Sequence, residues 1–128
     1  MARYFIFRHV KRSGYRDKIG EHYHFTSKSP NHKKVKAGSL VLIYEKERNC
    51  ITAIAKVGKV KKKKARRETE YFAIYEEFKR LKRPIFCDED FMARTGIRQR
   101  LDGKLPGIIE IDRKTYERVL QLVTKGLA

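Results

Sequence analysis

The chain has few cysteines and no long apolar segment, and both shortages exclude classes of protein. Only two of its 128 residues are cysteines, Cys50 and Cys87. Neither has a Cys or His neighbour at the spacing of a zinc site, and two thiols make no disulfide framework. We therefore expect reduced thiols in a cytoplasmic protein. No apolar run approaches the roughly 20 residues of a membrane span, and residues 1–8 are typical of a strand rather than a signal peptide.

Amide side chains are also scarce, with two Asn and two Gln among abundant Lys, Arg and Ile. This composition is often seen in thermophiles. The hydrophobic content of 41% favours a folded chain over a disordered basic tail. A length of 128 residues gives room for one hydrophobic core, so we expect a single domain over residues 1–128.

Acidic residues are rare in the first half of the chain only. Residues 1–67 hold 20 Lys and Arg against 4 Asp and Glu, a net charge of +16. Residues 68–128 hold 12 against 11, a net charge of +1. A thermophilic composition does not explain this asymmetry. A concentrated basic face is the electrostatic footprint of a protein that binds phosphate backbones.

The apolar pattern predicts an α+β fold that is mostly β. Gly58 marks a bulge or a close backbone approach within one predicted strand, where alternation places Val60 on the same face as Ile54 and Lys56. Asp88 and Asp112 are expected to cap helices. Strands are predicted over residues 3–10, 40–44, 51–60, 69–75 and 108–111, helices over 88–93 and 112–125, and loops over 15–25 and 26–31. Residues 76–83 extend the fourth strand or turn helical. The sum is a small twisted barrel of about five or six strands with flanking helices, one of them C-terminal.

Several short motifs in order carry a family resemblance. Residues 15–25 read Y-x-D-x-x-G-x-x-Y-x-F, and residues 38–44, 57–60 and 70–78 follow at suitable distances. This order resembles the EVE-type, PUA-like domains, relatives of the YTH readers of methylated adenine, that stand at the N-terminus of archaeal McrB-type restriction GTPases. The resemblance covers most of the chain. The chain departs from the pattern at Thr26, where Pro is common, at Ser39, where Asp is common, and in having no tryptophan.

The resemblance implies a PUA-like barrel that reads a modified base in double-stranded DNA. Methylated adenine and methylated or hydroxymethylated cytosine all remain open as that base. It also implies a role as the targeting domain of a restriction system, fused to or assembled with a GTPase or nuclease. The sequence leaves open whether the chain is a whole protein or one domain of a larger one.

Reading a base requires taking it out of the stack and enclosing it between aromatic rings, with a hydrogen bond to its edge. We expect Tyr15 and Tyr23, with Phe25, to form such a pocket, Asp17 to accept a hydrogen bond from the base, and His24 to stack on or bond the nucleotide. The alternative places Tyr23 and Phe25 in the core on an edge strand, Asp17 as a turn cap and His24 as a partly exposed loop residue.

The basic run at residues 56–67 holds eight Lys and Arg in twelve residues and no acid. On a hairpin tip such a run neutralises several phosphates; the alternative is a solvated loop. The expected phosphate-binding residues are Lys11, Arg12, Arg16, Lys18, Lys33, Lys34, Lys61, Lys62, Lys63, Lys64, Arg66 and Arg67.

The chain shows no pattern of a metal site or a catalytic centre. The four histidines lack metal spacing, and no phosphate loop, GxSxG or HExxH motif is present. We therefore expect a binding module without metal or cofactor and not an enzyme. The alternatives are a PUA-like RNA-binding domain acting on transfer or ribosomal RNA and, third, a nuclease with its site in the acidic half.

Overall fold

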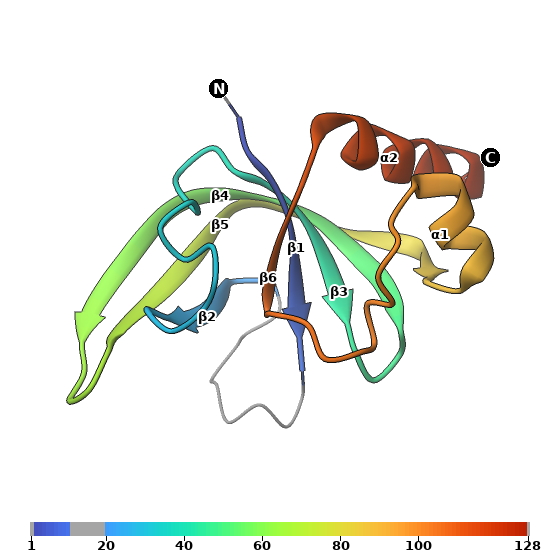
Figure 1. Ribbon diagram of the computed structural model, residues 1–128. Helices are drawn as coiled ribbons and strands as arrows, with labels where there is room; N and C mark the ends of the chain where they lie inside the picture. Colours follow the sequence, from blue (N-terminus) through green and yellow to red (C-terminus); the bar gives the residue numbers. More distant parts are fainter. Residues whose placement is uncertain (1, 11–19, 128) are drawn as a thin grey trace.

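The computed structural model describes residues 2–10 and 20–127. These residues form six strands and two helices (Figure 1). In chain order the elements are β1 (Tyr4–His9), β2 (His22–Thr26), β3 (Leu40–Glu45), β4 (Cys50–Lys64), β5 (Thr69–Phe86), α1 (Glu89–Thr95), β6 (Ile108–Ile111) and α2 (Arg113–Leu127).

All six strands belong to one sheet with the order β2-β5-β4-β3-β1-β6. Among the strands of the described residues, β1 and β3 alone pair in parallel, and the other neighbours are antiparallel. The long β4–β5 hairpin bends into an arch over β2, β1 and β6, while α1 and α2 lie together at one end of it (Figure 1). The mostly-β barrel with a C-terminal helix is therefore confirmed.

Both faces of the central strands are buried, because successive residues of a strand point to opposite sides. Phe5 and Phe7 of β1 enter the cluster inside the arch. Ile6, between them, joins the second cluster, which also holds Phe91 of α1 and Val119 of α2. This burial explains why residues 40–44 read as a continuous apolar run rather than an alternating one.

Strand β2 is where the sequence prediction of a loop is wrong. Residues 22–26 pair with β5 in a regular antiparallel ladder, from His22 opposite Ile74 to Thr26 opposite Glu70. The segment shows no period of two because both of its faces are covered: Tyr23 and Phe25 inside the arch, and His24 against Phe72 on the other side. Tertiary contacts thus decide the conformation that local pattern does not.

The two strands of the long hairpin extend further than their apolar patterns predict. Strand β4 continues through the basic run to Lys64, and β5 continues through residues 76–83 to Phe86. The extension of the fourth strand, one of the two predicted options for residues 76–83, is therefore confirmed. Pairing across the hairpin fixes Lys61 opposite Phe72 and Lys64 opposite Thr69, despite the low strand propensity of lysine.

Gly58 forms the predicted bulge, since the β4–β5 register shifts between Val57 and Lys59. A Cβ atom at Gly58 would lie 2.9 Å from the Cβ of Glu76, so the strands approach too closely for a side chain. The extra residue returns Val60 to the face of Val57, where it packs on the cluster inside the arch. The predicted placement of Val60 on the face of Ile54 and Lys56 is therefore wrong.

The expected helix caps are confirmed. Asp88 Oδ1 accepts a hydrogen bond from the Phe91 backbone N–H at 3.0 Å, and Asp112 Oδ1 accepts from that of Thr115 at 2.7 Å. These contacts satisfy N–H groups that the first turn of a helix leaves without a partner. Helix α2 extends two residues beyond its predicted end at 125.

Candidate nucleic-acid interface

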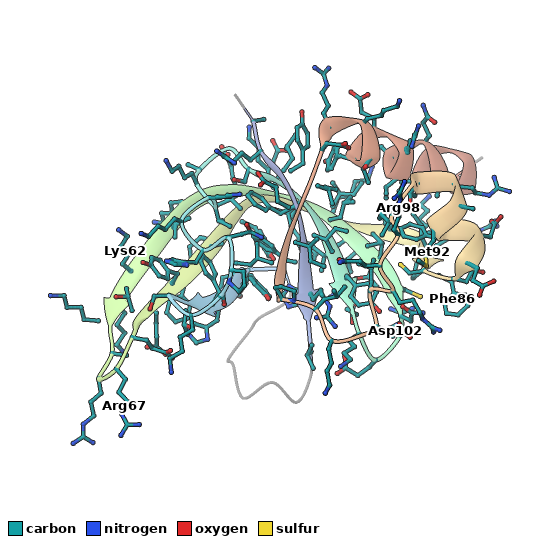
Figure 2. The ribbon with its side chains drawn as sticks, viewed as in Figure 1. Lys62, Arg67, Phe86, Met92, Arg98 and Asp102 are labelled. Atoms are coloured by element: carbon teal, nitrogen blue, oxygen red, sulfur yellow. The ribbon has the colours of Figure 1, made fainter. Side chains whose placement is uncertain are left out.

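The outer part of the β4–β5 hairpin projects from the barrel and carries most of the basic run. We call it the arm: residues 59–64 of β4, the turn 65–68 and residues 69–74 of β5. The turn is closed by a hydrogen bond from the Ala65 N–H to the Glu68 carbonyl at 2.9 Å. Figure 2 shows Lys62 and Arg67 along the arm, whereas Phe86 and Met92 lie at the opposite end of the molecule. The basic run is thus carried away from the end of the molecule where Phe86 lies.

The cations of the arm are exposed and make no ion pair with any residue in ranges 2–10 and 20–127. The one acid of the turn, Glu68, lies 3.6 Å from Lys28 of the neighbouring loop. The arm therefore presents uncompensated positive charge to solvent. The cations of the arm are Lys59, Lys61, Lys62, Lys63, Lys64, Arg66 and Arg67.

The inner face of the arm carries a tyrosine between an aromatic ring and a lysine. Tyr71 stacks on Phe25 of β2, with ring centroids 5.2 Å apart and planes inclined by 11°. The Lys62 ammonium lies 5.9 Å from the centroid of the Tyr71 ring. Lys62 and Tyr71 are cross-strand partners, so the pairing register holds the cation at the ring.

The outer face carries a second group of aromatic and ionisable side chains. Phe72 stacks on His24 at a centroid distance of 4.7 Å and meets His22 edge-on at 5.4 Å. The Nε2 atom of His24 lies 3.2 Å from a carboxylate oxygen of Glu70. Lys61 is the cross-strand partner of Phe72, so basic side chains stand on both faces of the arm.

Two of the expected base-pocket residues lie in the core. Tyr23 is 4% exposed and Phe25 1% exposed. Tyr23 stacks on Phe7 at 4.6 Å, and its hydroxyl donates to the Arg8 carbonyl at 3.1 Å. This placement corresponds to the second interpretation of these residues, core side chains on an edge strand. Their contact with a base stays a prediction.

Of the other expected site residues, the structure describes some and not the rest. His24 is buried in β2 rather than part of an exposed loop, and Lys33 and Lys34 are exposed in the loop between β2 and β3. The remaining expected residues lie outside the described ranges: Lys11, Arg12, Tyr15, Arg16, Asp17 and Lys18.

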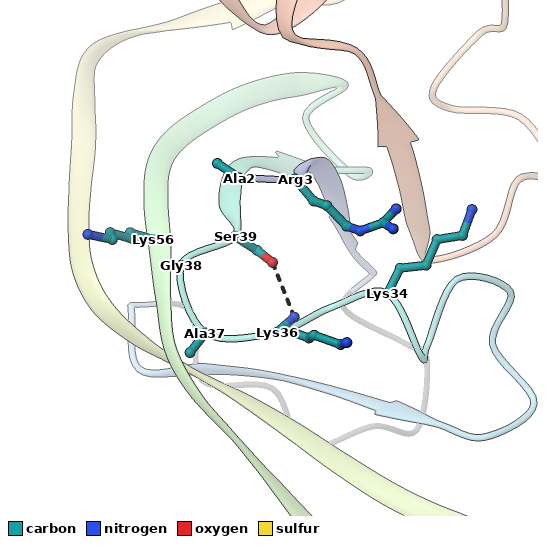
Figure 3. Close-up of a pocket in the computed structure, with 8 residues that line it drawn as sticks. All are labelled: Ala2, Arg3, Lys34, Lys36, Ala37, Gly38, Ser39 and Lys56. Atoms are coloured by element: carbon teal, nitrogen blue, oxygen red, sulfur yellow. Dashed lines mark hydrogen bonds between the residues drawn. The ribbon is translucent and has the colours of Figure 1, made fainter.

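The structure also reveals a basic hollow of about 490 Å³ that the sequence did not predict as a site (Figure 3). It is lined by residues from three separate segments, and no acid is among them. Only Lys34 was expected to meet phosphate. The sequence contains little that indicates this site, because Arg3 and Lys56 come next to the other lining residues only when β1 and β4 fold into the sheet. The lining residues are Ala2, Arg3, Lys34, Lys36, Ala37, Gly38, Ser39 and Lys56.

One carboxylate organises the edge of this basic hollow. Glu110 of β6 accepts from Arg3 Nη1 at 2.8 Å and from Lys34 Nζ at 3.0 Å, one cation on each oxygen. Hydrogen bonds from Lys34 and Arg3 lower the pKa of Glu110 below its ordinary value. The carboxylate therefore stays ionised at neutral pH and fixes both cations without cancelling their combined charge.

No group of three or more His, Cys, Asp or Glu lies close enough within the described residues to hold a metal ion. None of their helices is long and apolar enough to cross a membrane.

No family model matches the sequence, and no curated protein matches it. Among solved structures, the ASCH protein of Zymomonas mobilis is similar with a TM-score of 0.64 and 9% identity, over 93% of this chain and 94% of that one. Two variants of that protein give TM-scores of 0.65 and 0.64, each at 8% identity over 93% of this chain and over 95% and 97% of theirs. At this identity the similarity shows the fold alone. ASCH domains are PUA-like, so the predicted PUA-like fold is confirmed.

Proposed function

We propose that this protein is a nucleic-acid-binding module whose arm contacts the phosphate backbone. The observation that carries the proposal is the set of seven exposed cations on the arm, none of which pairs with an acid in the described part of the chain. The alternative interpretation of the basic run, a solvated loop, would also account for its positive charge. Here, however, the lysines are fixed by strand pairing on a projecting hairpin, at the end of the molecule opposite Phe86.

The physical basis of such binding is counterion release. Each phosphate neutralised by a lysine or arginine frees condensed cations, so affinity falls with rising salt in proportion to the number of contacts. Phosphate contacts position a protein without reading sequence. The arm therefore accounts for affinity, and choice between substrates must come from other residues.

For that choice we propose recognition of a modified base, for instance N6-methyladenine, flipped out of double-stranded DNA. In this role the protein targets a modification-dependent restriction system and works with a GTPase or nuclease. The EVE-type order of motifs supports this proposal. Because Tyr23 and Phe25 already pack against other rings, Tyr15 and Asp17 are the decisive residues to test.

The second candidate is binding of structured RNA. The PUA-like fold favours it, because ASCH and other PUA-like domains are generally RNA-binding modules. An RNA ligand would be recognised through its shape and single-stranded loops rather than through a flipped base in a duplex.

A binding panel separates the two candidates. Duplexes carrying N6-methyladenine, 5-methylcytosine, 5-hydroxymethylcytosine or no modification, and RNA of matched sequence, are titrated at one fixed salt concentration. Preference for one modified duplex, lost in Tyr15→Ala and Asp17→Ala, supports base reading. Tight binding to RNA alone, or equal binding to every duplex, contradicts it, and no binding to any polymer contradicts the proposed function as a whole.

A further inference from the structure

The basic hollow is a second concentration of positive charge, built separately from the arm. Arg3 precedes β1, and Lys34 and Lys36 belong to the loop before β3. Figure 3 shows these three side chains extending to one side of the loop, while Lys56 extends to the opposite side. Three cations from two distant segments therefore line the hollow on one side of this loop.

The loop that carries the lysines is held in one shape by its own hydrogen bonds. The Lys36 N–H donates to Ser39 Oγ at 3.2 Å, the Gly38 N–H to the Val57 carbonyl at 2.7 Å, and the Ser39 N–H to the Lys36 carbonyl at 3.1 Å. Gly38 has φ +90°, which favours glycine in this turn. Since these amides are already satisfied, a ligand would be recognised by side chains.

Glu110 positions two of the three cations in advance. Its contacts use one of the five N–H donors of Arg3 and one of the three of Lys34, so most donors remain for a ligand. Long side chains lose rotamer freedom when they bind, and the carboxylate has already imposed part of that loss. Lys36 makes no ion pair within the described residues.

Four cations line the hollow. Glu110, and Glu76 at 3.9 Å from Lys56, offset two of these charges and leave a net of +2. A phosphate monoester carries about −1.5 to −2 at pH 7, whereas each phosphate of a nucleic-acid backbone carries one negative charge. The volume of about 490 Å³ falls among those of small-molecule sites, so it leaves room for the group that the phosphate esterifies.

We propose that the basic hollow binds a phosphate monoester through Arg3, Lys34 and Lys36. The monoester is either a free nucleotide or the phosphorylated 5′ end of a nucleic-acid strand. The proposal goes beyond backbone binding by the arm, and it holds for the nucleotide even without that binding.

The test is calorimetric titration of the protein with adenosine 5′-monophosphate and with adenosine. We expect binding of the monophosphate and none of the nucleoside. Lys36→Ala should weaken monophosphate binding about tenfold or more, because a hydrogen bond to a charged group is lost. Lys114→Ala, an exposed lysine on α2, is the matched control and should change nothing. Equal affinities for monophosphate and nucleoside, or an unchanged Lys36→Ala, overturn the proposal.

The charge state of the ligand gives a second test. The second ionisation of a phosphate monoester has a pKa of about 6, so affinity should fall between pH 7.5 and pH 5. Glu110 stays ionised in this range because hydrogen bonds hold its pKa below the ordinary value. Affinity that is constant across the range contradicts a monoester.

The source of the phosphate is decided with oligonucleotides that carry a 5′-phosphate or a 5′-hydroxyl. Tighter binding of the phosphorylated strand, sensitive to Lys36→Ala, identifies a strand end. If the two oligonucleotides bind equally tightly and the free monophosphate also binds, the ligand is a nucleotide. Either of these two results supports binding of a phosphate monoester. A protein with Lys62, Lys63 and Lys64 changed to Glu separates the two sites, because it should lose backbone binding and keep the monophosphate.

Discussion

The Lys62 ammonium lies over the ring of Tyr71, 5.9 Å from its centroid, on the inner face of the arm. The two residues are direct partners across the β4–β5 hairpin. The Tyr71 ring in turn stacks on Phe25, a core residue of β2. A chain of contacts thus leads from the core to a solvent-exposed cation, so the arm is a supported structure rather than a loose loop.

The first prediction concerns the two faces of the arm. Lys61→Glu with Lys63→Glu reverses charge on the outer face, and Lys62→Glu with Lys64→Glu on the inner face. Since the cations contact phosphates, each double variant should weaken binding to all sequences alike. Fluorescence anisotropy at low salt measures this.

Lys104→Glu with Lys114→Glu is the matched control, because both lysines are exposed and lie outside the arm and the hollow. If both arm variants bind as tightly as the control, the arm takes no part in binding. Its lysines would then only keep the exposed edge of β4 from pairing with other chains.

The second prediction concerns Arg8, whose buried guanidinium ties β1 to the loop before β6. It donates to the carbonyls of Leu101 at 2.9 Å and Gly103 at 2.7 Å, and also to that of Leu105. Arg8→Met leaves these carbonyls without their donor, and we expect a loss of about 3 kcal/mol in the free energy of unfolding. Urea denaturation measures it.

The control for Arg8 is Arg48→Met, at an exposed position in the β3–β4 turn. This variant should stay within about 0.5 kcal/mol of the parent. Equal stability of the two variants would show that the Arg8 contacts contribute nothing.

The third prediction concerns the bulge at Gly58. The Cβ atom of Gly58→Ala would lie 2.9 Å from Glu76 Cβ, so the two strands must separate. We expect a loss of about 1–3 kcal/mol in stability, as for overpacking in a core. Thermal unfolding checks it against Lys59→Ala, an exposed neighbour; a Gly58→Ala variant as stable as this control would argue against the close approach.

The fourth prediction concerns the two free thiols. Burial raises the pKa of the Cys87 thiol to about 12 and also raises that of Cys50. The reactive species is the thiolate, so at pH 8 both should react with a disulfide reagent more slowly than a small thiol does, Cys87 the slower of the two. Denaturant should restore ordinary rates. Fast labelling of Cys87 in the folded protein contradicts its burial.

Sequence patterns predict the parts of the fold that local chemistry controls. Asp88 and Asp112 cap their helices because a side-chain oxygen three residues before the amide that it binds makes a local contact. Gly58 marks the bulge because only glycine tolerates the approach of Glu76. By contrast, β2 escapes prediction because Tyr23 and His24 are buried on opposite faces by residues distant in sequence, Phe7 and Phe72.

The candidate sites divide in the same way. The basic run is contiguous in the sequence, so the sequence alone predicts the positive charge of the arm. It does not predict the hollow, because Glu110 joins Arg3 to Lys34 across more than seventy residues of chain. Such a cluster exists only after β6 pairs with β1.

The salt dependence of duplex binding tests the central claim most directly. The dissociation constant is measured at salt concentrations from about 50 to about 200 mM, a range over which the number of phosphate contacts determines the loss of affinity. The parent protein is compared with the variant in which Lys62, Lys63 and Lys64 are changed to Glu. Loss of three phosphate contacts predicts a log–log slope smaller in magnitude by about three. Identical slopes for the two proteins would contradict a nucleic-acid-binding arm.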